Sequence, residues 1–170
     1  MDDINIEEFK KEILKFFVTF SRLEYALKAN GFFYECGGNV YPDWKEFAKK
    51  IKDELDTSSD TSLQEAIKFI LENRPKKQVV RSGKLDWKDI PENQGSKIEN
   101  LFGYIRRIRN NLFHGEKFTK KLPEKFDRDL SLVKNALLIL RKTVEFDKGI
   151  SEAFWDSPTW KRFLEPLLGK

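Results

Sequence analysis

The chain has 170 residues, of which 39% are apolar and 35% are charged, and its formal net charge at pH 7 is +4. This composition suits one domain with a single hydrophobic core, covering 1–170, and it excludes an intrinsically disordered chain. Acidic and basic residues are interspersed, which excludes a basic tail that binds nucleic acid by charge alone.

The first predicted element is a long helix from Ile4 to Asn30, because apolar residues recur there at helical spacing, and Gly31 ends it. The stretch "ECGGNVYP" contains two glycines and is predicted to be a loop. A second helix is expected from Pro42 to about Leu55. The acidic start "MDDINIEE" lacks the features of a secretory signal, and the early apolar run "ILKFFVTF" is too short to cross a bilayer.

The third predicted helix begins near Ser62, which forms a capping-box pattern with Glu65, and it ends near Asn73. The segment 75–95 is expected to be irregular. Its "KQVVR" stretch resembles a short strand, but no neighbouring stretch offers a clear partner.

A second capping-box pattern, formed by Ser96 and Glu99, predicts a fourth helix that runs to about Phe113, with Gly115 as its stop. Beyond it, the pattern predicts a long fifth helix over about 123–146 and a short last helix over 158–168. Together these elements predict an all-α bundle of about five to six helices, with the two long helices antiparallel.

Two charged side chains fall inside apolar stripes. On a helical wheel of the fourth helix with Ile98 at zero, Arg109 lies at about +20°, among the apolar residues. On the first helix with Ile13 at zero, Glu24 also lies at about +20°. We therefore expect Glu24 and Arg109 to pair, since an unpaired charge in an apolar stripe is costly, and breaking a buried pair costs about 3–5 kcal/mol.

The pair has two interpretations. It is either a structural ion pair that fixes helix register, or a device that aims Arg109 at an anion. The interpretation in which Arg109 binds an anion is favoured by His114. This residue is the only histidine and follows Arg109 by five residues, at the expected end of the helix. An arginine that holds a phosphate and a histidine that moves a proton are the groups needed to cleave a phosphodiester without a metal.

The stretch "RNNLFHG" at 109–115 resembles the signature of the HEPN domains, which is an Arg, commonly followed by a polar residue, and a His separated from the Arg by four to six residues; four residues intervene here. The stretch "FSRLEYALKANGF" at 20–32 is similar to the first helix of bacterial HEPN proteins. The resemblance covers the whole chain loosely and the motif closely. It implies a HEPN-like helical bundle and, as in many HEPN domains, a metal-independent endoribonuclease.

The resemblance further implies a homodimer in which the two motifs share one cleft. His114 would act as general base or acid, Arg109 would stabilise the phosphorane, and Asn110 would orient the cleft. The 2′-hydroxyl of RNA would attack its own phosphate and leave a 2′,3′-cyclic phosphate. Bacterial relatives often act as toxins or in phage defence, which implies a cognate antitoxin or a nucleotidyltransferase as partner. The position of the tyrosine that such a transferase modifies holds Glu116 here.

Three basic runs, at 74–81, 106–109 and 116–121, are either solvated surface or RNA-binding patches, and Arg106 and Lys117 are the RNA-binding candidates. No glycine-rich phosphate loop stands out. One histidine and one cysteine, Cys36, leave no metal-ligand set and no internal disulfide, so we expect no metal, no cofactor and a cytoplasmic location without membrane contact.

The alternative function is a non-enzymatic HEPN module that binds nucleotides, RNA or a partner protein. Its partner surface would draw on tryptophans, which are otherwise core or cover residues: Trp44, Trp87, Trp155 and Trp160.

Overall fold

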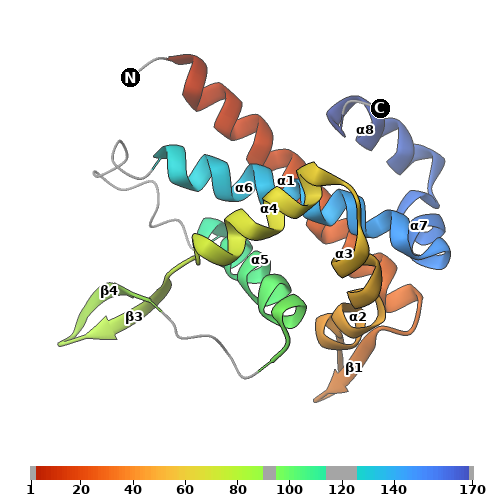
Figure 1. The fold of residues 1–170 in the computed structure, drawn as a ribbon, viewed down its shortest axis with the longest axis horizontal. Helices are drawn as coiled ribbons and strands as arrows, with labels where there is room; N and C mark the ends of the chain where they lie inside the picture. The colour runs from red at the N-terminus through yellow and green to blue at the C-terminus, as the bar shows by residue number, and fades with distance from the viewer. Residues whose placement is uncertain (1–2, 90–94, 114–125, 169–170) are drawn as a thin grey trace.

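The computed structural model describes residues 3–89, 95–113 and 126–168. In these residues the chain forms mainly α-helices, with two short antiparallel hairpins at the edge of the helical body (Figure 1). The predicted largely all-α fold is confirmed. The two hairpins were not predicted as such.

Helix α1 (Asp3–Ala29) matches the first predicted helix to within one residue at each end. Gly31 follows it with a φ of 83°, which a residue without a Cβ adopts at no steric cost. The backbone N–H of Phe32 then donates to the carbonyl of Leu27 over 2.9 Å, as in a helix that ends on a glycine.

The predicted loop after α1 is instead a hairpin of β1 (Phe33–Cys36) and β2 (Asn39–Pro42). Gly37 and Gly38 both have positive φ values, 58° and 77°, and form the two-residue turn that joins such strands. The loop prediction was wrong because it took the glycines as a loop and ignored the strand-forming aromatic and β-branched residues on both sides.

The predicted second helix is two helices, α2 (Trp44–Lys50) and α3 (Lys52–Thr57), which meet at Ile51. Helix α4 (Thr61–Glu72) is capped by Asp60, whose carboxylate accepts from the backbone N–H of Leu63 over 3.1 Å. The helix is therefore capped two residues before Ser62, and the capping box that the sequence suggested at Ser62 and Glu65 does not form its start.

The segment expected to be irregular contains a second hairpin of β3 (Lys77–Arg81) and β4 (Lys84–Lys88), joined by Ser82 and Gly83. Helix α5 (Lys97–Phe113) begins as predicted, since the Ser96 Oγ accepts from the backbone N–H of Glu99 over 3.2 Å.

The C-terminal third contains four elements: α6 (Phe126–Thr143), a 3₁₀ turn η3 (Val144–Phe146), α7 (Lys148–Trp155) and α8 (Pro158–Leu168). Helix α7 was not predicted from the sequence. The predicted stop at Gly115 and the first three residues of the predicted fifth helix, 123–125, lie outside the described residues.

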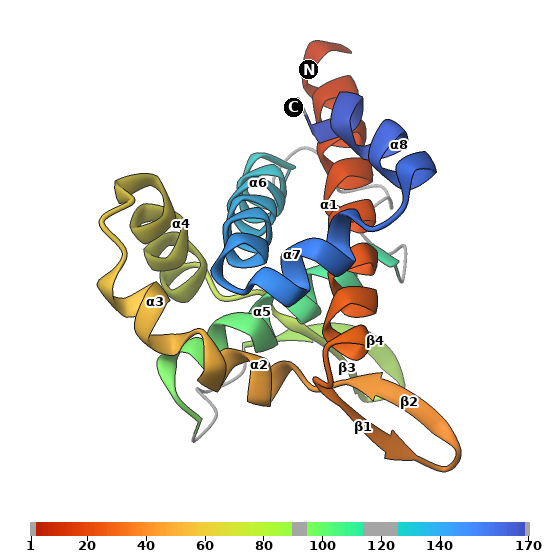
Figure 2. The same ribbon diagram turned by 90° about the vertical axis from the view of Figure 1, so that its right-hand side faces the viewer.

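The two long helices α1 and α6 lie side by side and run in the same direction (Figures 1 and 2), so the expected antiparallel arrangement was wrong. The Lys134 Nζ, midway along α6, lies 2.6 Å from the Glu8 Oε1 near the start of α1, and the Asn30 Nδ2, directly after α1, donates to the Gly149 carbonyl, which follows α6 in the chain. The antiparallel neighbour of α6 is α4. An apolar stripe predicts that a helix is covered, but it does not predict the direction of the helix that covers it.

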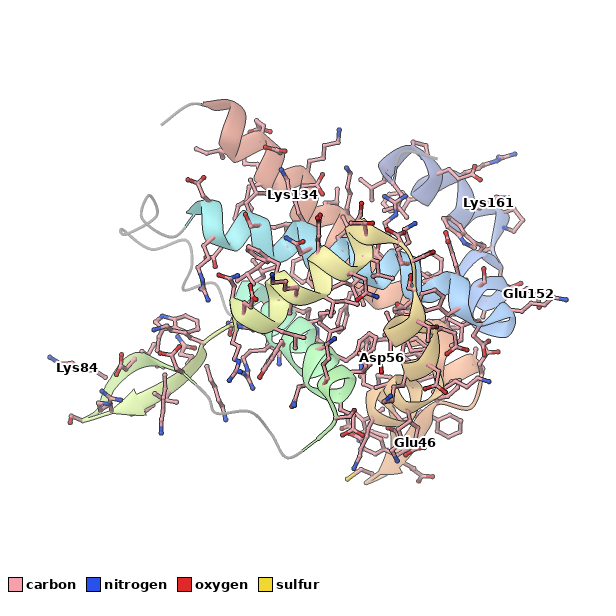
Figure 3. All side chains as sticks on the ribbon, in the orientation of Figure 1. Glu46, Asp56, Lys84, Lys134, Glu152 and Lys161 are labelled. Carbon is pink, nitrogen blue, oxygen red and sulfur yellow. The ribbon has the colours of Figure 1, made fainter. Side chains whose placement is uncertain are left out.

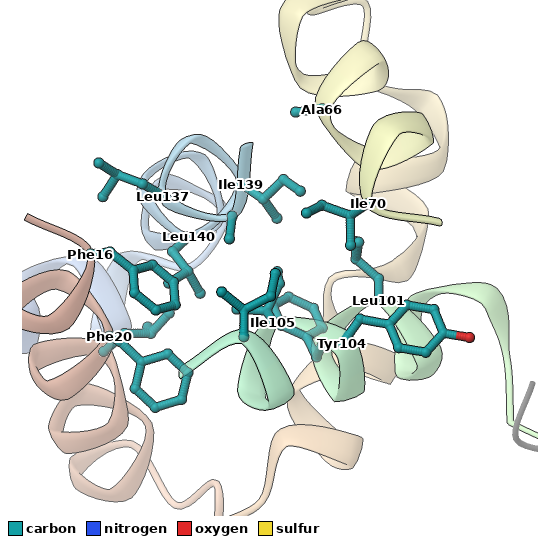
Figure 4. Close-up of a cluster of buried hydrophobic side chains, with 14 of the residues drawn as sticks. Phe16, Phe20, Ala66, Ile70, Leu101, Tyr104, Ile105, Leu137, Ile139 and Leu140 are labelled. Carbon is teal, nitrogen blue, oxygen red and sulfur yellow. The ribbon is translucent and has the colours of Figure 1, made fainter. Parts of the chain in front are cut away.

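The core lies where α1, α4, α5 and α6 meet (Figure 4). Phe16 and Phe20 of α1 face Leu140 of α6 there, while Ile105 of α5 and Ile70 of α4 close the cluster, and each of these side chains is at most 2% exposed. Among the described residues, none of the helices combines the length and the apolar character needed to span a bilayer.

Candidate functional site

The centre of the candidate site is an ion pair between α1 and α5. The Arg109 Nη2 lies 3.5 Å from the Glu24 Oε1, so the pairing expected from the helical wheels is present in the structure. The two helices run antiparallel at this point, because the Phe113 ring also contacts the Phe17 ring. The pair therefore joins the last two turns of α5 to the second half of α1.

A tryptophan of α2 supports the carboxylate from behind. The Trp44 Nε1 donates to the same oxygen of Glu24 over 3.4 Å, and the indole is only 3% exposed. Its ring packs between Phe20 and Phe102, at centroid distances of 5.2 and 5.5 Å. Trp44 thus has the core role considered in the sequence analysis, and it also fixes Glu24, a role that the sequence analysis missed.

The guanidinium of Arg109 is held on a second side by an aromatic ring, since its Cζ lies 5.0 Å from the centroid of Phe20. Such a cation–π contact is strengthened when the ring is buried, and Phe20 is 2% exposed. A carboxylate and a ring therefore restrict one arginine side chain, which leaves it pre-oriented rather than free to rotate.

The ion pair is less buried than the wheels suggested. The side chain of Arg109 is 31% exposed and that of Glu24 is 24% exposed. The expected cost of about 3–5 kcal/mol for breaking a buried pair does not apply to a pair that water reaches. The same exposure leaves part of the guanidinium accessible to a ligand.

The two asparagines that follow Arg109 differ in their surroundings. Asn110, the residue singled out from the motif, is exposed on α5. Asn111 is 9% exposed, and its Nδ2 donates to the Lys76 carbonyl over 2.9 Å. Asn111 thereby anchors the segment that leads into β3. The wheel contains no signal for this role, because the covering segment is distant in sequence.

The two arginines before the motif also differ in their burial. Arg106 is exposed, as an RNA-contacting candidate should be. Arg107 is half-buried over the Tyr104 ring and donates to the Pro75 carbonyl over 3.3 Å. Burial lowers the pKa of the Arg107 guanidinium from its ordinary value, although it remains a cation at any physiological pH.

An apolar patch borders the ion pair. Phe113, the last residue of α5, is 69% exposed and makes an edge-to-face contact with Phe17 at 5.2 Å. Leu14, one turn earlier on α1, is 49% exposed. We call Leu14, Phe17 and Phe113 the α1–α5 patch.

Two of the predicted site residues, His114 and Lys117, lie outside the described residues. The motif is therefore seen up to Phe113, the residue directly before the histidine. Among the described residues, the structure brings Glu24 and Arg109 together and leaves Asn110 and Arg106 exposed on the same helix.

Comparisons with protein-family models, with curated proteins and with solved structures find no match for this chain.

Proposed function

We propose that the chain is a metal-independent endoribonuclease of the HEPN type that cleaves RNA through attack of a 2′-hydroxyl on the adjacent phosphate. The observation that carries the proposal is the held and partly exposed guanidinium of Arg109, paired with Glu24 and packed on Phe20, five residues before the only histidine. Preorganised cations of this kind stabilise charge that develops in a transition state without paying for reorientation.

In the proposed reaction, neutral His114 accepts the proton of the 2′-hydroxyl while its oxygen forms a bond to phosphorus. Arg109 stabilises the additional negative charge on the phosphorane oxygens. The bond from phosphorus to the 5′ oxygen then breaks, and this oxygen takes a proton from a protonated His114 of a second copy. The products are a 2′,3′-cyclic phosphate and a 5′-hydroxyl. DNA lacks the attacking group and is not cleaved.

The use of a second copy makes a homodimer part of the proposal. The α1–α5 patch supports it, because exposed apolar side chains beside the ion pair offer a surface on which the same surface of another copy can pack. A bacterial toxin or phage-defence effector, controlled by a partner protein, is the role we propose for such a nuclease.

The test is cleavage of a 5′-labelled single-stranded RNA in EDTA by the parent and by His114→Ala. Removing a general acid–base group lowers rates by about 10² to 10⁴, so we expect the variant to lose at least a hundredfold. Arg109→Lys should lose activity as well, because an ammonium cannot reproduce the planar donors of a guanidinium. Lys161→Ala on α8 is the control that should cleave at the parental rate.

A His114→Ala protein that cleaves RNA as fast as the parent would contradict the proposal. DNA of the same sequence should remain intact in every sample, and the RNA product should carry a cyclic phosphate.

A second candidate function is a non-enzymatic RNA-binding module. The basic hairpin β3–β4 favours it, because this hairpin offers charge for binding without any catalytic group. Stable RNA binding by the parent without products in EDTA would select this function.

A further inference from the structure

The hairpin β3–β4 extends away from the helices (Figure 1), and Lys84 at its turn lies at the far end of the molecule from α8 (Figure 3). We call residues 77–88 the arm. Its turn residues Ser82 and Gly83 have φ values of 51° and 74°, which fit the two-residue turn of a tight hairpin. The side chains next to the turn are exposed, Val80 by 72% and Leu85 by 63%.

The register of the arm separates its side chains by chemistry. Residues directly opposite each other in an antiparallel pair point to the same face, and the faces alternate along the strands. Lys77 lies opposite Lys88, Val79 opposite Asp86, and Arg81 opposite Lys84 on one face. Gln78 with Trp87, and Val80 with Leu85, form the other face. We call the first of these the cationic face.

The cationic face contains two pairs of like charges directly opposite each other. Such pairs destabilise a hairpin, because their Cβ atoms lie only about 4.5–5.5 Å apart. The single acid on this face, Asp86, lies 3.3 Å from the Arg81 Nη1. Among the described residues, Lys77, Lys84 and Lys88 have no ion-pair partner. Four cations against one acid give this face a net charge of +3.

The spacing of the two cation pairs favours an extended anion. Lys77 and Arg81 are four residues apart on one strand, which corresponds to about 13 Å at about 3.3 Å per residue. A single small anion can reach one pair but not both. A nucleic-acid strand carries phosphates at regular intervals and can contact both pairs at once.

The base of the arm is fixed to the helix that ends in the candidate site. Asn111 and Arg107 of α5 both donate to backbone carbonyls of the segment that enters β3, those of Lys76 and Pro75. An ion pair of 3.1 Å between Lys76 and Asp89 closes the two ends of the hairpin. The arm is therefore anchored to the last turns of α5, the helix that carries Arg109.

We propose that the cationic face of the arm, which is anchored to the helix that carries Arg109, binds the phosphate backbone of a single-stranded RNA. The choice of RNA rests on the proposed nuclease function, whereas the phosphate binding rests on the arm alone. The geometry favours a nucleic acid over an anionic membrane, because the exposed apolar pair Val80 and Leu85 lies on the face opposite the cations. Insertion of that face into a bilayer would turn the cations away from the lipid headgroups.

The test measures binding of a fluorescent single-stranded RNA by anisotropy across a range of salt concentrations. All proteins carry His114→Ala, so that cleavage does not interfere. Each phosphate contact to a single strand contributes about 0.7 to the slope of log affinity against log salt. The double variant Lys77→Gln/Lys88→Gln should therefore have a slope smaller by about 1.4, and so should Arg81→Gln/Lys84→Gln. Between 50 and 200 mM salt, the parent then loses about sevenfold more affinity than either variant.

The matched control is Lys148→Gln/Lys161→Gln, which removes the same charge from α7 and α8 and should keep the parental slope. The variant Lys77→Gln/Lys88→Gln should also melt at the same temperature as the parent or higher, since it relieves a repulsive pair and leaves the ion pair of Arg81 with Asp86 in place. This second readout separates a binding surface from a structural one.

The same slope in the arm variants as in the parent, or no RNA binding by the parent at low salt, would overturn the proposal. So would loss of binding to phosphatidylserine vesicles in the arm variants with RNA binding unchanged, which would identify a membrane surface. A second outcome separates the two proposals. If the slope of log affinity against log salt is smaller in the arm variants while the protein that retains His114 cleaves no RNA, the arm proposal stands and the nuclease proposal fails.

Discussion

Glu24 connects three elements through one oxygen atom. Its Oε1 lies 3.5 Å from the Arg109 Nη2 and accepts from the Trp44 Nε1, so the carboxylate is set by α2 and in turn sets a side chain of α5. Arg109 is held by this ion pair on one side and by a ring contact on another. A change at Glu24 should therefore alter the orientation of the Arg109 side chain more than it alters the stability of the fold.

We predict that Glu24→Gln lowers RNA cleavage strongly and stability only slightly. Glutamine keeps an oxygen that accepts from Trp44 but removes the charge that holds Arg109. For a partly exposed pair the cost is about 1 kcal/mol or less, which corresponds to about 2–4 °C in melting temperature for a chain of this size.

The control for this variant is Glu12→Gln, which breaks the ion pair of Glu12 with Lys15 on the same helix at similar exposure. It should change the melting temperature by a comparable amount and leave cleavage unchanged. Equal cleavage by Glu24→Gln and the parent would show that the ion pair is structural only.

At the scale of single elements, the N-terminus of α4 joins two parts of the bundle. Asp60 caps the helix and also forms an ion pair of 2.8 Å with Lys142 near the end of α6. The hydrogen bond from Lys142, followed by that from the Leu63 backbone, holds the pKa of the Asp60 carboxyl below its ordinary value.

A lowered pKa in the folded state makes stability depend on pH in a defined direction. The stabilisation from Asp60 is fully present above its unfolded pKa of about 3.9 and is lost as the pH falls through the lower folded value. We predict that Asp60→Asn, which retains a good capping residue, flattens the loss of melting temperature between about pH 5 and pH 3. Asp53→Asn on α3, at a side chain that is 94% exposed, should retain the parental pH profile. An identical profile for Asp60→Asn and the parent would contradict this assignment.

The elements that could be predicted from sequence are those whose signals are local. The periodic apolar residues of α1 predicted both ends of this helix, and the capping serine predicted the start of α5, each to within a residue or two. The Glu24–Arg109 pair was also predictable, because two charges in two apolar stripes have few other partners. Both hairpins were missed or left unpaired, since two-residue glycine turns were taken as breaks. The buried amide of Asn111 and the support from Trp44 depend on segments that meet only in the folded chain.

At the scale of the whole molecule, the α1–α5 patch predicts how copies associate. We expect the parent to have twice the chain mass of 20.1 kDa in light scattering at micromolar concentration. Phe113→Ser should shift it to the mass of one chain, because an exposed ring at the centre of an interface is replaced by a small polar group.

Val80→Ser, at a side chain of similar exposure on the arm, should keep the parental mass. A parent with the mass of a single chain under these conditions would contradict the dimer.

The parallel packing of α1 on α6 has a consequence for how the chain is made. Glu8 and Lys134, which contact each other between the two helices, are separated by 126 residues. A ribosome adds about 5–20 residues per second, so α1 is synthesised roughly 6–25 s before the helix that covers it. During this interval the apolar face that contains Phe16 and Leu23 has no native partner on α6 or α7. The nascent chain therefore exposes this part of the α1 face to water until α6 has left the ribosome.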